Sequence, residues 1–286
     1  MSEDLQEALS AAASELEVPG AAAGVIAEGV EHYGFHGVTS AENPLSVDES
    51  TLFQFGSTGK TYTATAVLRL VERGEVDLDA PARTYIPELK LKDDDVARRV
   101  TVLQLLNHTA GWTGDRLDST GDGDDALAKY VELMAGFDQV SPPGAEVSYN
   151  NASLSLAGRI IEKVTGSTFE QAIKDLLLTP LGMDHTFFFA NDVMTRRFAV
   201  GHTRHEDGRI TVNRPWAMPR SMAPAGGMSA PAADQLRWAR FHLGTGTSVD
   251  GTRILSEELL GRMQQPTADM AGSALGDAVG IGWLLR

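Results

Sequence analysis

The chain has 286 residues, of which 39 are acidic and 24 are Lys or Arg, so its formal net charge is −15. This acidic balance argues against a protein whose main partner is nucleic acid, because such domains present a basic surface to the phosphate backbone. Hydrophobic residues make up 42% of the chain, which is enough for a folded core. The absence of cysteine excludes disulfides, thiolate metal sites and a cysteine nucleophile.

The apolar runs of the sequence are short pieces such as residues 21–27, well below the ~20 residues that a helix needs to cross a bilayer. The N-terminal sequence Met1 to Leu5 lacks the basic and apolar regions of a signal peptide. We therefore expect a protein without a membrane span. Its expected location is cytoplasmic as the sequence stands, and secreted or periplasmic if an N-terminal segment has been removed.

The first quarter of the chain predicts a helix, a hairpin and a second helix. Apolar residues recur at helical spacing over residues 3–17. Small and β-branched residues over 21–37, interrupted by Glu28 and Gly29, predict a β-hairpin. A further helix is predicted from residue 57 to residue 73, where a glycine follows.

The middle of the chain, about residues 75–190, has a mainly helical pattern separated by polar loops. The helices predicted there and further on span residues 102–106, 125–135, 154–163, 169–177 and 232–243. The last apolar segment, residues 279–285, predicts a strand.

The segment Phe55 to Thr61 carries the first candidate chemistry. Ser57 stands at the start of a predicted helix, and Lys60 follows three residues later, so the two side chains share one face. A serine hydroxyl becomes a good nucleophile when a nearby base removes its proton, and a buried lysine can have a pKa low enough to do so. The backbone amide at the helix start would stabilise a developing oxyanion.

Two other interpretations of this segment remain open at this point. Gly59-Lys60-Thr61 could end a phosphate-binding loop, although that loop requires a glycine at the position of Gln54. Alternatively, the segment is a turn with a helix cap, and Lys60 is an ordinary solvated side chain.

Over most of its length the chain resembles the serine β-lactamase and penicillin-binding-protein-like superfamily, and within it the class C β-lactamase and esterase branch. The blocks that carry the resemblance occur in the family's order at residues 19–20, 51–53, 57–60, 74–79, 85–88, 105–111, 143–151, 180–183, 225–228 and 280–283. One such block is weak evidence, but this many in one order is strong.

The family's second motif is a tyrosine and an asparagine separated by one residue, matched here by Tyr149 and Asn151. The resemblance implies that Tyr149 is the general base near Ser57, with phenolate character favoured by the charge of Lys60. It implies that Asn151 hydrogen-bonds Lys60 and a substrate amide. Without the family, the two residues would be a loop tyrosine and a helix cap.

The family's third motif, a Lys or His followed after one residue by Gly on a strand, is not found. His242-Leu243-Gly244 matches by letters but follows a predicted helix, and the sequence ends at Arg286, shortly after the block at 280–283. Relative to the family, the chain is therefore expected to be truncated, without the strand that supplies the second oxyanion-hole amide. The seven histidines show no metal-binding spacing, so no metal and no cofactor are expected.

These patterns predict an α/β (α+β), β-lactamase-like fold. Residues 1–55 and 225–286 would form a mixed-sheet domain, from which C-terminal strands are missing, and residues 56–224 a mainly helical domain. The predicted function is a serine acyl hydrolase that forms a covalent acyl-enzyme on Ser57. Its expected substrates are β-lactams, D-amino-acid peptides, or small esters and amides. The alternative is a catalytically silent, penicillin-binding-like protein that only binds such ligands.

Overall fold

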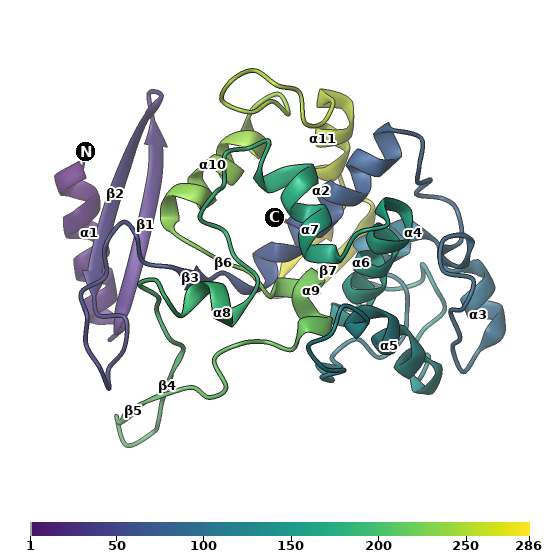
Figure 1. Cartoon of the computed structure of the whole chain (residues 1–286), viewed down its shortest axis with the longest axis horizontal. Coiled ribbons are helices and arrows are strands. Elements are labelled where there is room, and N and C mark those ends of the chain that lie inside the picture. The colour runs from purple at the N-terminus through teal and green to yellow at the C-terminus, as the bar shows by residue number, and fades with distance from the viewer. Residues whose placement is uncertain (1) are drawn as a thin grey trace. The chain divides into compact units, whose positions relative to one another are not determined.

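The computed structural model describes residues 2–286. The contacts divide the chain into two compact units, each of which combines separate parts of the sequence. Unit 1 comprises the chain up to Phe55 together with residues 181–218 and 228–243, and unit 2 comprises residues 56–180, 219–227 and 244–286. Figure 1 labels most of the helices and strands of both units.

In unit 1, helix α1 (Ser2–Glu15) packs on a hairpin formed by β1 (Gly20–Ala27) and β2 (Val30–Gly37), as Figure 1 shows. The Gln6 side chain joins the helix to the hairpin, because its amide accepts a hydrogen bond from the Phe35 N–H and donates one to the Phe35 carbonyl, both at 2.9 Å. The predicted N-terminal helix and hairpin are confirmed.

The hairpin turns at Glu28 and Gly29, which both have positive φ, as a tight turn between twisted antiparallel strands requires. Helix α10 (Ala232–Leu243) packs against β1. A Cβ atom on Gly24 would lie only 2.6 Å from the Leu236 side chain, so the absence of a side chain at Gly24 allows this close packing. The bounds of α10 are those predicted.

The other elements of unit 1 are β3 (Phe53–Gln54), α8 (Ala190–Val193), β4 (His202–Arg204), β5 (Ile210–Val212) and β6 (Ser229–Ala230). The fully buried carboxylate of Asp234 joins α10 to the segment that precedes α8. It accepts hydrogen bonds from the His185 N–H at 3.0 Å and the Thr186 hydroxyl at 2.9 Å, and it pairs with Arg237 at 2.7 Å.

Unit 2 is mainly helical. Its helices are α2 (Gly59–Glu72), α3 (Asp94–Arg99), α4 (Val102–Leu106), α5 (Ala126–Leu133), α6 (Asn151–Thr165), α7 (Phe169–Ile173), α9 (Ala223–Gly226) and α11 (Glu257–Met263). Most residues of α2 and α6 are buried, and these two helices contact each other and the short helix α9. Their contact forms the core of the unit and fixes the residues around Ser57.

Two helices differ from their predicted bounds. Helix α6 begins at Asn151, three residues earlier than predicted, because the Asn150 side chain accepts a hydrogen bond from the Ser153 N–H at 2.8 Å and caps the helix. The helix predicted over 169–177 is present, but it changes from an α-helix to a π-helix over Lys174–Leu178.

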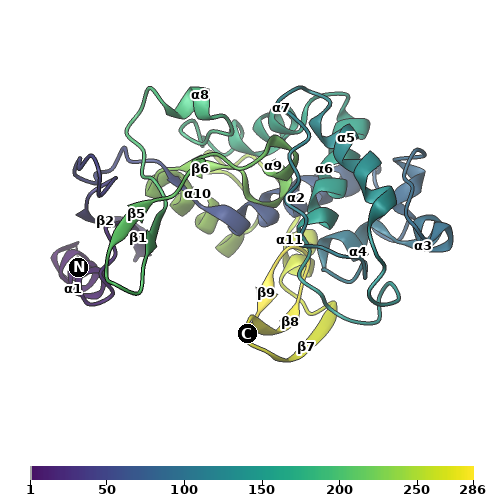
Figure 2. The ribbon, with the colours of Figure 1, turned by 90° about the horizontal axis from the view of Figure 1, so that it is seen from below.

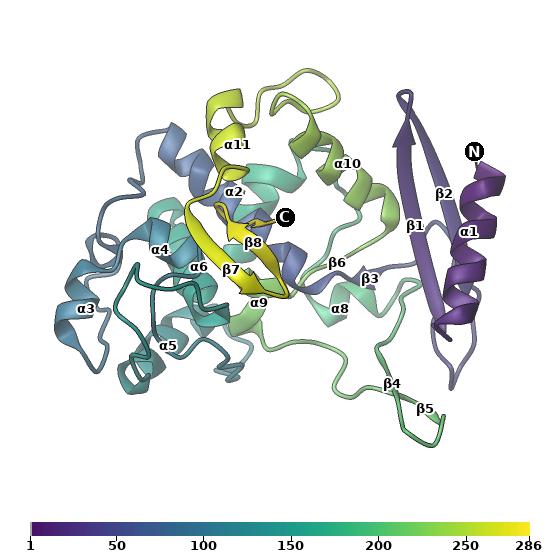
Figure 3. The ribbon, with the colours of Figure 1, turned by 180° about the vertical axis from the view of Figure 1, so that it is seen from behind.

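The C-terminal part of unit 2 is an antiparallel sheet of β7 (Ala268–Ser273), β8 (Gly276–Val279) and β9 (Leu284–Leu285). Figure 2 shows this sheet in yellow after α11, and Figure 3 shows it from another side. The strand predicted at the end of the chain is present as β9, but residues 279–285 do not form one continuous strand. The strand conformation is interrupted between β8 and β9. Gly282, in this interval, has a φ of +76° and donates its N–H to the Leu106 carbonyl at 3.0 Å.

The α+β class is confirmed, and within residues 2–286 the strands form four small sheets. The compact units divide the chain differently from the predicted domains: the division after Phe55 coincides, but residues 181–218 group with the N-terminal hairpin and 244–286 with the helices. Asn107, the residue after α4, donates a hydrogen bond to Thr267, the residue before β7, and so links these two segments of unit 2. The domain boundaries stay a prediction, since compact units need not coincide with independently folding domains. Within residues 2–286, no helix combines the length and apolar character needed to span a bilayer.

Candidate active site

The predicted nucleophile, Ser57, lies in a short 3-10 turn, Gly56–Thr58, that leads directly into α2. Lys60 lies in the first turn of α2, and its Nζ donates a hydrogen bond to Ser57 Oγ at 3.0 Å. Ser57 is exposed, whereas Lys60 is only 3% exposed. A buried amine therefore contacts a hydroxyl that a substrate can reach.

The surroundings of Lys60 set its protonation. Burial lowers the pKa of Lys60 to about 8, because the charged form loses its hydration. Its second hydrogen bond goes to the Ala225 carbonyl, at 2.8 Å, and within the described residues no carboxylate pairs with it. Near neutral and mildly alkaline pH, this amine can therefore both accept and release a proton.

The same contacts decide between the three interpretations of the segment around Ser57. A solvated lysine is contradicted, because Lys60 is buried. A phosphate loop requires the lysine to reach a bound phosphate, and here the Lys60 amine is directed to Ser57 and Ala225 instead. The serine-nucleophile interpretation is the one that agrees with this geometry.

Tyr149, the tyrosine of the second motif, lies next to this pair. Lys60 Nζ lies 4.8 Å from the centroid of the Tyr149 ring, and the phenol shares a side-chain hydrogen bond with Ser57. Burial raises the pKa of Tyr149, and this outweighs the lowering effect of the Ser57 hydrogen bond. The expected phenolate character is therefore not favoured in the free protein, because burial desolvates the phenol and it keeps its proton.

His108 lies behind Tyr149, with the two ring centroids 4.7 Å apart. Its Nδ1 accepts a hydrogen bond from the Asn150 N–H at 3.0 Å. Burial, and then the nearby charge of Lys60, lower the pKa of His108 to about 4, so the ring is neutral at pH 7. A neutral ring supports Tyr149 without adding a second positive charge beside Lys60.

The start of α6 positions the asparagine of the second motif. The helix cap is Asn150, not Asn151, and the fully buried Asn150 side chain also donates to the Trp112 carbonyl at 2.8 Å. The N–H groups of Asn151 and Ala152 donate to the Gly114 carbonyl at 3.1 and 3.2 Å. The chain at residues 112–114 is thus fixed against the first turn of α6.

The expected hydrogen bond between Asn151 and Lys60 is not formed within the described residues. The Asn151 Nδ2 donates instead to Asp115 Oδ1 at 3.5 Å, and Lys60 takes the Ala225 carbonyl as its acceptor. The role of Asn151 in substrate binding stays a prediction. Asp115 and Ala225 were missed by the sequence reasoning, because no local pattern marks a residue that contributes through a long-range contact.

Helix α9 approaches the start of α2 very closely. Its residues Pro224 and Ala225 accept side-chain hydrogen bonds from Thr63 and Lys60, both at 2.8 Å. A Cβ atom on Gly226 would lie 2.7 Å from both the carbonyl carbon and the oxygen of Gly56. Glycine at position 226 is thus required for the backbone next to Ser57 to keep its place.

We expect Gly226→Ala to reduce the rate at which an acylating probe modifies Ser57 by roughly 10- to 100-fold, because a small displacement of a reacting group has effects of this size. The measurement is the labelling rate followed by intact mass, together with the melting temperature. Gly261→Ala is the matched control, since a Cβ there meets no atom within 4 Å. An unchanged labelling rate in Gly226→Ala would contradict the positioning role.

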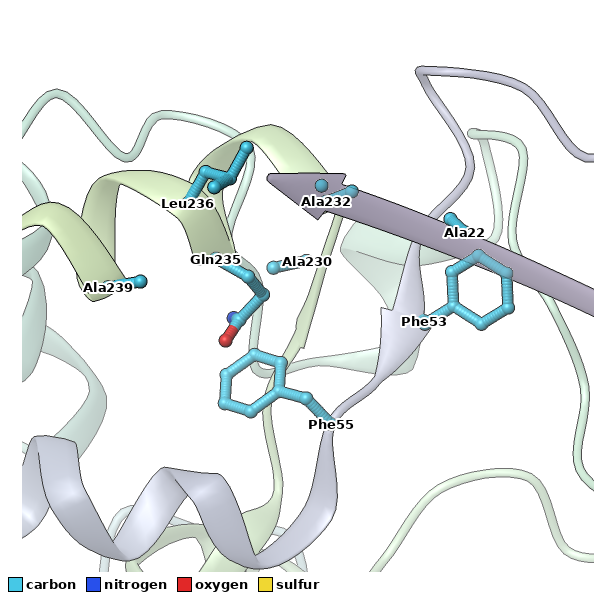
Figure 4. A pocket seen from close by; sticks show the side chains of 9 residues that line it. Ala22, Phe53, Phe55, Ala230, Ala232, Gln235, Leu236 and Ala239 are labelled. Carbon is cyan, nitrogen blue, oxygen red and sulfur yellow. The ribbon is translucent and has the colours of Figure 1, made fainter. Parts of the chain in front are cut away.

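A pocket of about 220 Å³ lies in unit 1. Figure 4 shows that Phe53, Phe55 and small side chains of β1, β6 and α10 line it, with Gln235 as the polar group. None of the four motif residues lines it, so it carries none of the chemistry described above. Among the described residues, no group of three or more His, Cys, Asp or Glu side chains is placed to hold a metal ion.

The α+β fold and the Ser57–Lys60–Tyr149 cluster together define a class of protein, the serine hydrolases with a Ser-x-x-Lys motif. In this class the lysine activates the serine for attack on a carbonyl, and the acyl group is carried covalently on the serine oxygen.

The chain belongs to the Beta-lactamase family, whose sequence model matches residues 5–286. It is 38% identical over 284 residues to penicillin-binding protein 4 of Amycolatopsis lactamdurans, which covers 98% of this chain and 74% of that protein. It is 28% identical to a β-lactamase of Lysobacter lactamgenus, over 88% of this chain and 64% of that protein. The chain thus spans about two thirds to three quarters of the length of these relatives.

Solved structures show the same fold. The penicillin-binding protein homologue of Pyrococcus abyssi superposes with a TM-score of 0.80 at 26% identity, over 99% of this chain and 64% of that one. The class C β-lactamase of Rhodobacter sphaeroides superposes with a TM-score of 0.74 at 25% identity, over 95% of this chain and 72% of that one. The resemblance inferred from the sequence blocks is confirmed.

Proposed function

We propose that the protein is a serine acyl hydrolase that acts through a covalent acyl-enzyme on β-lactams, D-amino-acid peptides, or small esters and amides. The observation that carries this proposal is the contact of an exposed Ser57 hydroxyl with a buried Lys60 amine whose pKa is about 8. Family membership and relatives described as penicillin-binding proteins and β-lactamases support the substrate classes.

In the first step, neutral Lys60 accepts the Ser57 proton while Ser57 Oγ bonds to the substrate carbonyl carbon. The negative charge that develops on the carbonyl oxygen faces the Ser57 N–H, which lies at the start of α2 where helix N–H groups lack internal partners. The bond to the leaving nitrogen or oxygen then breaks. The proton on Lys60 passes to the leaving atom through the Tyr149 phenol, which is hydrogen-bonded to Ser57.

In the second step, water hydrolyses the acyl-enzyme. Lys60, again neutral after transfer of its proton, accepts a proton from the water as the water oxygen bonds to the acyl carbon. The ester bond to Ser57 Oγ then breaks, and the serine oxygen regains a proton from Lys60. The protein returns to its starting protonation state, and the net reaction is hydrolysis of one acyl bond.

The test is intact-mass analysis after incubation with a fluorophosphonate, with benzylpenicillin and with a p-nitrophenyl ester, each followed by a turnover assay. An adduct on Ser57 together with turnover supports the hydrolase. A stable penicillin adduct without turnover would indicate that deacylation is blocked and that the protein binds penicillin covalently. No adduct with any of the three probes would overturn the proposal in favour of a catalytically silent ligand-binding protein.

A further inference from the structure

Asp115 is the acidic residue of its loop whose side chain contacts a residue of the second motif. Within the described residues 115–125, Asp118 pairs with Arg116 at 2.9 Å, Asp124 with Arg220 at 2.9 Å and Asp125 with Lys129 at 2.8 Å, whereas the side chains of Asp115 and Asp122 form no ion pair. Asp115 is exposed and pairs with no cation; its side chain only accepts the 3.5 Å hydrogen bond from Asn151 Nδ2. Its negative charge is therefore available to a ligand.

The position of Asp115 is set by the backbone that precedes it. The Gly114 carbonyl accepts hydrogen bonds from the Asn151 and Ala152 N–H groups, and the Trp112 carbonyl accepts one from the Asn150 side chain. A Cβ on Gly114 would lie 2.4 Å from Asn150 Nδ2, so this stretch lies as close to the helix start as a glycine allows. Asp115 is thus placed at the first turn of α6, beside Asn151.

Neither Arg116 nor Lys60 pairs with Asp115. Arg116 is directed to Asp118, and its guanidinium carbon lies 4.8 Å from the centroid of the Phe137 ring. Lys60 is hydrogen-bonded to Ser57 and the Ala225 carbonyl, and not to Asn151. The Lys60 amine therefore lies at Ser57, where the substrate carbonyl would react, and the unpaired Asp115 carboxylate lies beside Asn151.

We propose that Asp115 is a specificity-determining residue that favours substrates with a positively charged group on the acyl chain, at the position that lies beside Asn151. This inference rests on the proposed function, because it concerns the substrates of the same serine. It names a substrate class: acyl donors with a free amino or quaternary ammonium group, in preference to neutral acyl donors of the same shape. Such a contact discriminates between the two kinds of substrate, because a neutral acyl donor leaves the Asp115 carboxylate without a counter-ion.

The experiment compares two p-nitrophenyl esters of the same shape. One carries γ-(trimethylammonio)butyrate as its acyl group, and in the other a tert-butyl group replaces the trimethylammonium group. The measured quantity is the ratio of kcat/KM for the cationic ester to that for the neutral ester. We expect a ratio of roughly three to ten in the wild type, the size of one partly screened charge pair, and a fall of the ratio in about 1 M salt, where the screening length is ~3 Å.

Asp115→Asn removes the charge but keeps an amide oxygen that can accept the Asn151 hydrogen bond, so it separates charge from positioning. We expect the ratio in this variant to approach one, chiefly through a lower kcat/KM for the cationic ester. Asp122→Asn is the matched control: it makes the same change in net charge on an exposed side chain of the same loop, and its ratio should equal that of the wild type.

The outcomes separate the two proposals. Hydrolysis of both esters with a ratio of one in the wild type would overturn the role of Asp115 and leave the serine hydrolase intact. A high ratio that persists in Asp115→Asn, or that falls equally in Asp122→Asn, would assign the preference to the overall charge of the protein and overturn the role of Asp115. No acylation of Ser57 by either ester would overturn both proposals.

Discussion

Ser57→Ala is expected to abolish the covalent adduct with fluorophosphonate or benzylpenicillin and to lower turnover by roughly 10³- to 10⁶-fold, the range seen when a catalytic nucleophile is removed. The physical reason is that, among the described residues, Ser57 has the hydroxyl that accepts a hydrogen bond from Lys60, whose other hydrogen bond goes to the Ala225 carbonyl. Intact mass and initial rates measure the two effects. Because Ser57 is exposed and Lys60 keeps the Ala225 carbonyl as an acceptor, the variant should remain folded.

Ser148→Ala is the matched control for this variant, because Ser148 is an exposed serine next to Tyr149 in sequence. It should retain the adduct and most of the turnover. If instead Ser57→Ala is still labelled, and peptide mapping places the label at Ser148 or elsewhere, then Ser57 is not the nucleophile. A loss of labelling accompanied by a loss of the folded state would be detected by the melting temperature of the same sample.

The second large effect concerns Lys60 and pH. Because burial lowers the pKa of Lys60 to about 8, the neutral amine becomes the major form as the pH rises through that value. The rate of Ser57 acylation, measured as kcat/KM, should therefore rise with pH and level off above a midpoint near 8, since this parameter reports the pKa of the essential base in the free enzyme. Below the midpoint the rate should fall about tenfold per pH unit, as the protonated fraction cannot accept a proton.

Lys60→Arg tests the assignment of this midpoint. Arginine keeps a positive charge and a donor for the Ala225 carbonyl, but its pKa is too high for it to act as a base. We expect the acylation rate to fall by roughly 10²- to 10⁴-fold, the usual contribution of a general base, and the rise near pH 8 to disappear. Lys129→Arg, which replaces an exposed lysine paired with Asp125, should retain both the rate and the midpoint.

A profile that keeps its midpoint near 8 in Lys60→Arg would contradict the role of Lys60 as the base. If Tyr149 were the base, the wild-type rate would instead continue to rise to much more alkaline pH, because burial raises the pKa of Tyr149. The position of the midpoint therefore distinguishes the amine from the phenol without further variants.

Much of the helical structure could be predicted from local sequence. The helices at 102–106 and 232–243 have the predicted bounds, because their apolar spacing and end signals are local. The hairpin at 20–37 is determined by its turn residues in the same way. The extent of the C-terminal strand was not predicted, because the break between β8 and β9 depends on the contact of Gly282 with Leu106, which is 176 positions earlier in the chain (282 − 106).

The sequence by itself determined the residue types of the site: a serine and a lysine one helical turn apart, a tyrosine and asparagine of the second motif, and membership of the Beta-lactamase family. The tertiary structure decided how these residues act. The pKa of Lys60 depends on its burial among α2, α9 and the Tyr149 ring, and the Asn151 amide turns to Asp115 rather than to Lys60. Protonation and hydrogen-bond partners depend on desolvation and on contacts between distant segments, which the order of residues alone does not specify.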